Sequence, residues 1–316
     1  MYKYLAMLCL FIGNQLFAQS SANKNEAESS KDTSTSSLDV TLGITNSAFS
    51  QHSSALSADA LAQKLFFVPA IAYYDKSGFG ITATTYFDFE SGVKNPFQWS
   101  ISPSYDYTKN KNFAIGASYN YYFGRDANSK YSSPYQHEIY AYYTNKEGWL
   151  NWGLSADFAT GTATENYSKD SVVTGALGVQ RTVKLSATAN TKTTDLIISP
   201  TISHEFLIDG IFNDDDVLSI KPSFMVNAGA GKYSATYTGN VSSFALTQLK
   251  ARKKNVKGLG GTDNTPFKLQ SAAIDALVTY QLNKFSVVPE FYLEYFLPKS
   301  ESRFNYIYTI NVGYSF

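Results

Sequence analysis

Hydrophobic and polar residues alternate along most of the chain after residue 37. The pattern is clearest in residues 303–316, where every even position from Phe304 to Phe316 is apolar or aromatic and every odd position except Ile307 is polar or small. A period of two over this length predicts an extended strand with one apolar and one polar face. Counting that strand, about 14 amphipathic stretches follow one another, beginning near residues 38, 65, 79, 96, 112, 134, 149, 171, 195, 216, 232, 266, 284 and 303.

The connections between these stretches alternate between tight turns and longer polar loops. The tight turns are expected at residues 75–78, 108–111, 145–148, 190–193, 228–231 and 282–284. A transmembrane β-barrel has short turns on its periplasmic rim and long loops outside, whereas a soluble sandwich has no reason to separate them. The pattern therefore predicts an all-β, antiparallel, up-and-down transmembrane β-barrel over residues 38–316, with about 14 strands and 12 as the alternative count.

Composition favours the same fold class. Aromatic and charged residues each make up 16% of the 316 residues, whereas soluble domains carry about 25% charged residues. The mean hydropathy of −0.21 argues against a bundle of membrane helices, but it fits strands of which only alternate residues face lipid. The net charge is zero, so nucleic acid is not an expected partner, because phosphate binding needs a basic surplus.

The amino terminus has the layout of a secretory signal peptide. Lys3 precedes a short apolar run that contains the only cysteine, Cys9, and Ala18 offers a cleavage position. We expect residues 1–18 to be the signal peptide. The next segment, 19–37, is polar and Ser-rich, so we expect a disordered periplasmic leader.

These features together resemble a Gram-negative outer-membrane β-barrel of the porin-like group, and the leader ending in LFAQ is similar to exported proteins of Bacteroidota. The resemblance implies an outer-membrane location, contact with outer-membrane lipid and lipopolysaccharide, and recognition by the outer-membrane assembly machinery. It assigns the assembly signal to Ile310, Val312, Tyr314 and Phe316 in the last strand. The oligomeric state is left open.

The polar phase of the strands predicts the residues that line the lumen. Ten inward positions are acidic and four are basic by this phase, so the wall is expected to favour cations over anions. Inward tyrosines, such as Tyr86, Tyr122 and Tyr292, could partly fill the bore. The lumen residues that we single out are Asp88, Asp106, Asp157, Asp275, Glu290, Glu294, Lys221 and Arg303.

Two charged loops are open to more than one interpretation. Asp214, Asp215 and Asp216 lie in a predicted extracellular loop, where carboxylate oxygens could hold Ca²⁺, although a solvated turn is the favoured interpretation and no metal site is predicted. Basic residues gather at 250–257 in a loop that either lies on anionic headgroups or folds into the barrel as a constriction.

The histidines do not predict an enzyme. His52 lies in a polar loop, and His137 and His204 lie near strand ends. Their polar neighbours in sequence point to the opposite face of the strand, so they cannot form a catalytic pair. We therefore predict no catalytic residue and no cofactor. The function favoured is a porin-like passive channel for small hydrophilic solutes with a mildly acidic lumen. The alternatives are a non-conducting barrel that displays its loops for binding or adhesion and, less favoured, a lipid-modifying barrel enzyme.

Overall fold

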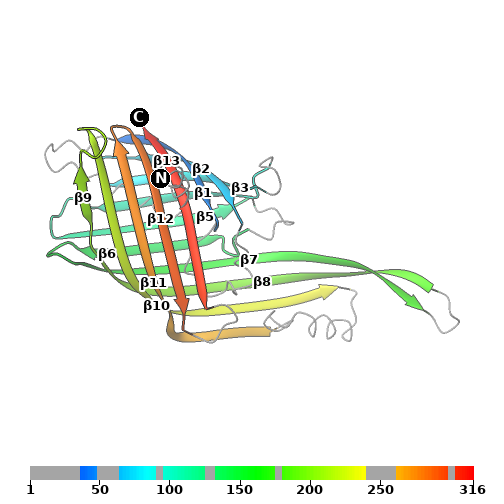
Figure 1. Cartoon of the computed structure of the whole chain (residues 1–316). Helices are drawn as coiled ribbons and strands as arrows, with labels where there is room; N and C mark the ends of the chain where they lie inside the picture. Colours follow the sequence, from blue (N-terminus) through cyan, green and yellow to red (C-terminus); the bar gives the residue numbers. More distant parts are fainter. Residues whose placement is uncertain are drawn as a thin grey trace, which may run out of the picture.

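The chain folds into a closed antiparallel β-barrel, which Figure 1 shows from the side. The structure is a computed structural model, and it describes residues 36–47, 64–89, 95–124, 132–174, 180–239, 261–297 and 303–316. The strands are β1 (Ser37–Thr45), β2 (Phe66–Tyr74), β3 (Phe79–Asp88), β4 (Gln98–Tyr107), β5 (Phe113–Phe123), β6 (His137–Asn145), β7 (Asn151–Thr174), β8 (Gln180–Ser203), β9 (Phe206–Asp209), β10 (Asp216–Gly239), β11 (Gly261–Leu282), β12 (Phe285–Phe296) and β13 (Phe304–Ser315).

The last strand closes the barrel against the first. β13 pairs with β1 from Asp39↔Ser315 to Thr45↔Thr309, and it pairs with β12 on its other side. The other strands pair with their neighbours in sequence, except that β10 bonds to both β8 and β11 while the short β9 bonds only to β10. Twelve strands therefore form the wall and β9 is an addition. This confirms the all-β antiparallel barrel and the alternative count of 12.

The larger count was wrong because two strand pairs are longer than a membrane requires. Residues 161–170, expected as a loop, lie in β7, and 190–193, expected as a turn, lie in β8. Their ladder runs without a break from Asn151↔Ser203 to Thr174↔Gln180. Thr recurs in this region, and as a β-branched residue it favours an extended strand.

The expected turn at 228–231 is also wrong, because its glycines lie inside β10. A Cβ at Gly229 would lie 2.5 Å from the Leu196 carbonyl oxygen on β8, so the glycine allows close strand approach. The β10–β11 register shifts here, between Asn227 and Ala228 and between Gly229 and Gly231. Glycine in a strand often marks such a bulge.

These longer strands change the position of the acidic loop. With one crossing fewer before it, the turn between β9 and β10 lies beside the β11–β12 turn, since Asp216 pairs with Leu282. Asp214, Asp215 and Asp216 are therefore on the rim of the short turns and the carboxy terminus. Their predicted position on the long-loop rim is wrong.

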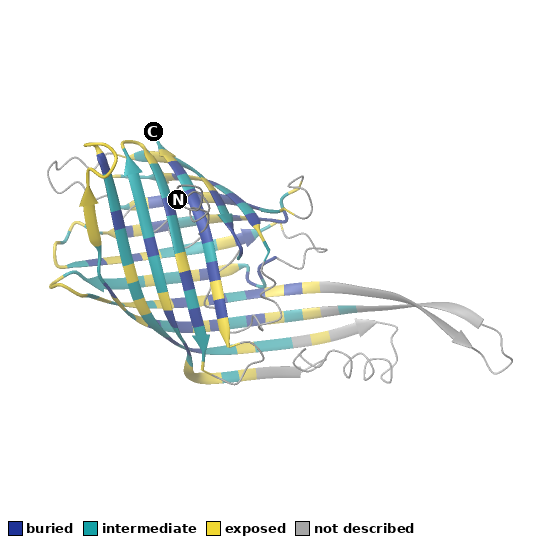
Figure 2. Ribbon diagram, viewed as in Figure 1, coloured by how far each residue is buried: buried dark blue, intermediate teal, exposed yellow. Residues whose placement is uncertain are grey.

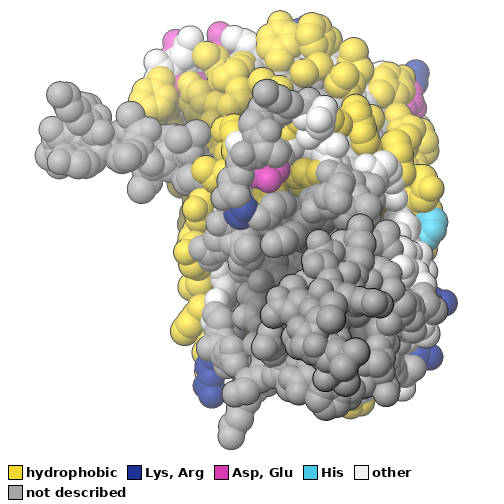
Figure 3. Space-filling model, turned by 90° about the vertical axis from the view of Figure 1, so that its right-hand side faces the viewer, with side chains coloured by type: hydrophobic (Ala, Val, Ile, Leu, Met, Phe, Trp, Pro, Cys, Tyr) yellow, Lys and Arg dark blue, Asp and Glu magenta, His cyan; other side chains and the backbone are white. Residues whose placement is uncertain are grey.

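Burial alternates along the strands, as Figure 2 shows by colour. On β13, Phe304, Tyr306 and Tyr314 are exposed, whereas Asn305 and Asn311 between them are buried. In Figure 3, hydrophobic side chains gather around the outer edge of the view. An apolar outside and a polar inside are the arrangement of a transmembrane barrel. No helix long and apolar enough to cross a bilayer occurs in the part of the chain that the structure describes.

Four of the strand prolines are accommodated without a change of register, whereas Pro266 of β11 lies at the shift opposite Gly229 and Gly231. Pairing is interrupted on one side at Pro69, Pro103, Pro200 and Pro289 and then resumes in the same register. Proline lacks the N–H that the ladder needs, so each gap is local. Pro222 lies opposite the break between β8 and β9, where its carbonyl accepts the His204 N–H at 3.3 Å.

Candidate functional site: the polar interior of the barrel

The inner face of the wall is built mainly from polar side chains, and most of them are buried. Because alternate residues of each strand face inward, closure of the barrel brings polar residues from strands distant in sequence into one interior. The buried polar and charged residues of the strands include Thr82, Thr84, Gln98, Ser100, Asp106, Glu138, Asp157, Asp195, Ser199, Asn227, Ser271, Glu294, Asn305, Thr309 and Asn311.

Tyrosine hydroxyls donate to carboxylates at three places in this interior. The Tyr122 hydroxyl donates to Glu138 Oε2 at 2.6 Å, and the Tyr142 hydroxyl donates to Asp106 Oδ1 at 2.7 Å. Tyr135 donates in the same way to Asp195. Hydrogen bonds to a carboxylate are stronger than those between neutral groups, so these pairs hold the carboxylates in set positions.

The Tyr142–Asp106 pair spans two strand spacings, from β6 to β4, across Gly116 on β5. A Cβ at Gly116 would lie 2.3 Å from Asp106 Oδ1 and 2.5 Å from the Tyr142 ring. Only glycine leaves room for the two side chains to meet over the middle strand.

A second network joins β8, β10, β11 and β12. The Asn227 amide donates to Ser271 Oγ at 2.9 Å, to Glu294 Oε1 at 3.3 Å and to the Tyr292 hydroxyl at 3.3 Å. Its carbonyl oxygen accepts from Ser199 Oγ at 2.7 Å. Ser271 Oγ also donates to Glu294 Oε1 at 2.5 Å. Four strands are therefore tied through one buried amide.

The structure distributes the predicted lumen residues unevenly between the inside and the rim. Asp106, Asp157 and Glu294 are buried. Asp88, Asp275, Glu290 and Lys221 are partly buried, and the Asp275 carboxylate accepts the Ser223 hydroxyl at 3.4 Å. Arg303 is exposed near a rim, where it donates to the Tyr295 hydroxyl at 2.8 Å.

Sequence reasoning missed Asp195 and Asn227, which contribute to the two kinds of polar contact above. Asp195 was placed at the start of a strand next to a supposed turn, and Asn227 was placed at a strand end. The signal that could have found Asp195 is the inward phase of Asp195, Ile197 and Ser199 on β8, continued through the supposed turn.

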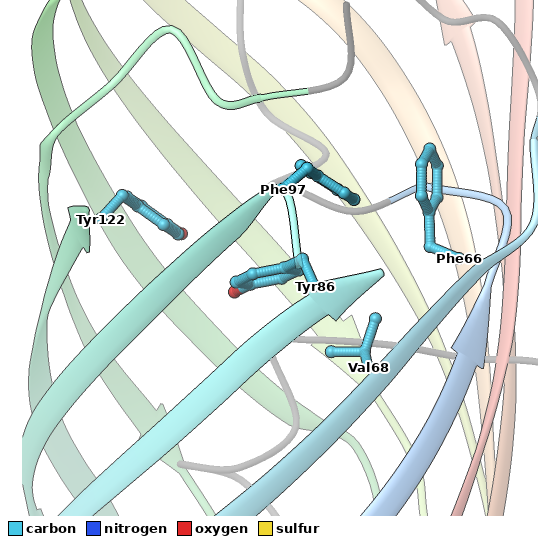
Figure 4. Close-up of a cluster of buried hydrophobic side chains, with 5 residues drawn as sticks. All are labelled: Phe66, Val68, Tyr86, Phe97 and Tyr122. Atoms are coloured by element: carbon cyan, nitrogen blue, oxygen red, sulfur yellow. The ribbon is translucent and has the colours of Figure 1, made fainter. Parts of the chain in front are cut away.

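Aromatic side chains fill one sector of the interior at the end where the long loops lie. Figure 4 shows Phe66, Val68, Tyr86, Phe97 and Tyr122 pointing toward one another. The Phe66 and Phe97 ring centroids lie 5.6 Å apart, and those of Tyr86 and Tyr122 lie 6.5 Å apart. Such tilted pairs are favourable beyond the area that they bury. We call these five residues the aromatic cluster.

The acidic turn is held by its own backbone. The Asp216 carboxylate accepts the N–H groups of Ile211, Phe212 and Asn213 at 2.7, 2.9 and 3.0 Å. It also accepts the Tyr280 hydroxyl at 3.0 Å. Among the described residues no group of three or more His, Cys, Asp or Glu side chains could hold a metal ion.

The two described histidines contact aromatic and backbone groups. His137 Nδ1 lies 2.6 Å from the Tyr119 hydroxyl, and its ring stacks on that of Tyr119 and is tilted against that of Tyr121. His204 Nδ1 lies 2.5 Å from the Trp149 carbonyl oxygen. His52 and the basic residues at 250–257 lie outside the described ranges.

The residues of the supposed assembly signal lie on β13 beside the closing pairs. Ile310 is buried opposite Ile44 of β1, Val312 is half-buried, and Tyr314 and Phe316 are exposed. The Tyr314 and Phe316 rings meet edge to face with centroids 4.9 Å apart.

Comparisons with known proteins leave the family open. No family model matches the chain, and no curated protein matches it. Solved structures with a similar fold include the NanC porin, at 10% identity and a TM-score of 0.34, with 88% of this chain and 98% of that one covered. OprB of Pseudomonas putida matches at 9% identity and a TM-score of 0.24, with 89% and 94% covered. The TodX monoaromatic hydrocarbon channel matches at 9% identity and a TM-score of 0.29, with 89% and 88% covered. At such scores none of these likenesses carries a functional argument.

Proposed function

We propose that the chain is an outer-membrane β-barrel that acts as a porin-like passive channel for small hydrophilic solutes. The observation that carries this proposal is the division of the wall into an apolar exposed face and a polar buried face, on a barrel closed by pairing of β1 with β13. A barrel that only needed to be stable could fill its interior with apolar side chains. An interior of hydroxyls, amides and carboxylates instead suits the passage of hydrophilic solutes.

The charge of the wall favours cations. Asp106, Glu138, Asp157, Asp195 and Glu294 are buried in it, whereas the described inner positions that we singled out include one lysine, Lys221. A surplus of fixed negative charge in a low-dielectric surround raises the local concentration of cations and repels anions. We therefore propose that K⁺ and small cationic solutes pass more readily than anions of the same size.

The further parts of the proposal concern export and assembly. Residues 1–18 would be removed as a signal peptide, and β13 with Phe316 at its end would present Ile310, Val312, Tyr314 and Phe316 to the assembly machinery. Outer-membrane lipid and lipopolysaccharide would then surround the exposed apolar face. Each of these parts predicts a measurable event: a mature chain that begins after Ala18, and slower insertion when Phe316 is removed.

Planar-bilayer recording of the purified, refolded protein tests the channel. We expect stepwise conductance in KCl and, in a salt gradient, a reversal potential that favours K⁺ over Cl⁻. Absence of current at any voltage, in a sample that still shows heat-dependent migration on a gel, would contradict the channel. A current without cation preference would contradict only the role of the acidic wall.

A second candidate function is display of a binding surface, and a specific observation favours it. A strand of about 10 residues crosses a bilayer, but β7 and β8 have 24 residues each. Pairing of β6 with β7 ends at His137↔Thr160, so the rest of β7 extends past β6 together with β8, as Figure 1 shows. On its other side β8 stays paired with β10 as far as Ala187. We call residues 161–174 of β7 and 180–193 of β8 the ribbon. Adhesion of producing cells to immobilised polysaccharides or proteins, with and without the ribbon, tests this function.

A further inference from the structure

Residues 132–136, between β5 and β6, lie inside the mouth of the barrel at the end of the long loops. Ser133 and Tyr135 are 1% and 4% exposed, although they belong to a connection that would ordinarily lie on the surface. We call Ser132–Gln136 the mouth strap. Its contacts reach inner-facing residues of strands on both sides of β5 and β6.

One end of the mouth strap is held on β4. The Ser133 N–H donates to the Gln98 side-chain oxygen at 2.8 Å, and Gln98 is only 2% exposed. Ser133 Oγ in turn accepts the Tyr135 N–H at 3.1 Å. A buried amide that satisfies a loop N–H is a specific contact, because either group alone would lose its water without compensation.

The other end is held on β7 and β8. The Tyr135 hydroxyl donates to the buried Asp195 carboxylate on β8. The Gln136 side-chain amide bonds both the N–H and the carbonyl of Thr162 on β7, as a neighbouring strand would. Gln136 therefore binds β7 and Tyr135 binds β8, which are the first and second strands after β6 in the wall.

A glycine allows the strap to lie against the wall. A Cβ at Gly161 on β7 would lie 2.2 Å from the Pro134 carbonyl oxygen and 2.5 Å from Tyr135 Cα. Any larger residue would push the strap away from β7. The backbone of the strap is thus in direct contact with the inner face of the wall and is not suspended above it.

The strap lies next to the aromatic cluster, because Tyr122 belongs to that cluster and its N–H donates to the Gln136 carbonyl at 2.8 Å. The cluster fills the inner side of β2–β5, and the strap spans from β4 to β8. Together they occupy one sector of the mouth, where the side chains of the cluster and those of Ser132, Ser133 and Tyr135 in the strap are buried. Solutes must then pass through the remaining sector.

We propose that the mouth strap is a fixed constriction that sets the size limit of the channel. This inference rests on the proposed channel function. The strap narrows the mouth because four groups anchor it inside the wall: the Gln98 amide, the Asp195 carboxylate, the Thr162 backbone and the space left by Gly161. The strap does not need to move to narrow the mouth, since all four anchoring groups belong to strands of the barrel or to the first two β7 residues of the ribbon.

The test compares the wild-type channel with two variants that release the strap. Gln98→Ala with Tyr135→Ala removes the anchors on β4 and β8, and Gly161→Ala places a methyl group where Pro134 lies. In each we expect single-channel conductance to rise by about twofold or more, and liposomes to admit larger neutral sugars than the wild type admits. Thr164→Ala is the matched control, because it removes the exposed bond to Asn190 on the same hairpin and leaves the strap intact.

Hydrogen exchange provides a measurement that does not depend on conduction. The Ser133 amide should exchange slowly in the wild type and in Thr164→Ala, and at least about tenfold faster in the released variants. Wild-type conductance and size limit in a folded variant with a fast Ser133 amide would overturn the inference and leave the channel standing. A slow Ser133 amide in the released variants would overturn it as well. If only the released variants conduct current, the constriction by the strap is supported, and the wild-type protein is a closed channel and not a passive one. No current in any variant would reject the channel function and the constriction with it.

Discussion

At the scale of single residues, glycine and proline do most to shape this barrel. Gly116 lets two inner side chains meet across a strand, Gly161 admits the mouth strap, and Gly229 lies at the bulged part of β10. Pro69 and Pro103 interrupt pairing on one side and keep the register. Both effects are invisible in hydrophobic periodicity, because that pattern records which face a residue lies on and not what it leaves room for.

The space at Gly116 gives a direct prediction. Gly116→Val should separate the Tyr142 hydroxyl from Asp106 and leave a buried carboxylate without its donor, which costs about 1–3 kcal/mol. Urea unfolding in lipid vesicles measures the change in free energy. Ala117→Val, on the exposed face of the same strand, is the control and should change stability by less than about 0.5 kcal/mol. Equal stability of the two variants would contradict this role of the glycine.

The turn at Asp75 predicts a pH dependence. Hydrogen bonds from the Ser77 side chain and backbone and from the Ser36 hydroxyl lower the pKa of Asp75 to about 2. In the unfolded chain an aspartate has a pKa of about 3.9. Because the folded value is the lower one, the stabilisation is complete above the unfolded pKa and is lost as the pH falls through the folded pKa.

Asp75→Asn should therefore unfold with a weaker acid dependence than the wild type between about pH 4 and pH 2. The difference between the two unfolding midpoints, followed over this window, measures the effect. Ser36→Ala should move the wild-type curve part of the way toward that of the variant. A difference that stays constant from neutral to acid pH would argue against the hydrogen-bonded carboxylate as its origin.

At the scale of elements, the ribbon and the short β9 are the departures from an ideal barrel. The ribbon continues β7 and β8 by about 45 Å at the usual rise of a strand. On the opposite rim, the short β9 pairs only with β10, and its Phe206, Leu207 and Ile208 side chains are exposed. Both follow from strand lengths that exceed the wall, and neither is needed to close the sheet.

The ribbon should therefore be dispensable for folding of the barrel. A chain in which a short Asn-Gly turn replaces residues 164–190 keeps Ala163 and Thr191, which pair in β7 and β8, and loses only the pairs of 187–190 with 236–239 at the end of β10. We expect this chain to assemble, to migrate as a folded barrel without heating and to unfold at nearly the wild-type urea concentration. The mouth strap keeps its bond to Thr162, so the conductance should also stay unchanged. Loss of assembly would mean that the ribbon is part of the folding unit.

At the scale of the whole molecule, the hydrophobic pattern predicts that the barrel closes and which face of each strand is buried. It does not predict the contacts between side chains. The alternation on β13 indicated which residues are buried, and twelve strands were the stated alternative. Fourteen were preferred because Thr193 and Gly229 were interpreted as turn residues, although the ladder runs through both. Whether a polar stretch turns or extends depends on the partner strand, and one chain read by itself does not specify that partner.

The same limit explains which site residues were missed. Asp106 and Glu294 follow from the phase of their own strands. The pairing of Tyr142 with Asp106 depends on the register of three strands, and that of Tyr135 with Asp195 depends on a loop that turns inward. Each such contact depends on the pairing register of several strands, and one misplaced turn shifts the register of every strand that follows it.

The ribbon has a mechanical consequence. Its strands are the same covalent strands that form the wall, and the β7–β8 ladder runs from the tip to Ser203 without a bulge or a hinge. The register shifts that the structure describes lie in a different ladder, between β10 and β11, at Ala228 and Gly231. A load applied to the tip therefore acts as on a cantilever, and it twists the part of the wall that holds Asp157 and Asp195 and, through Thr162, the mouth strap.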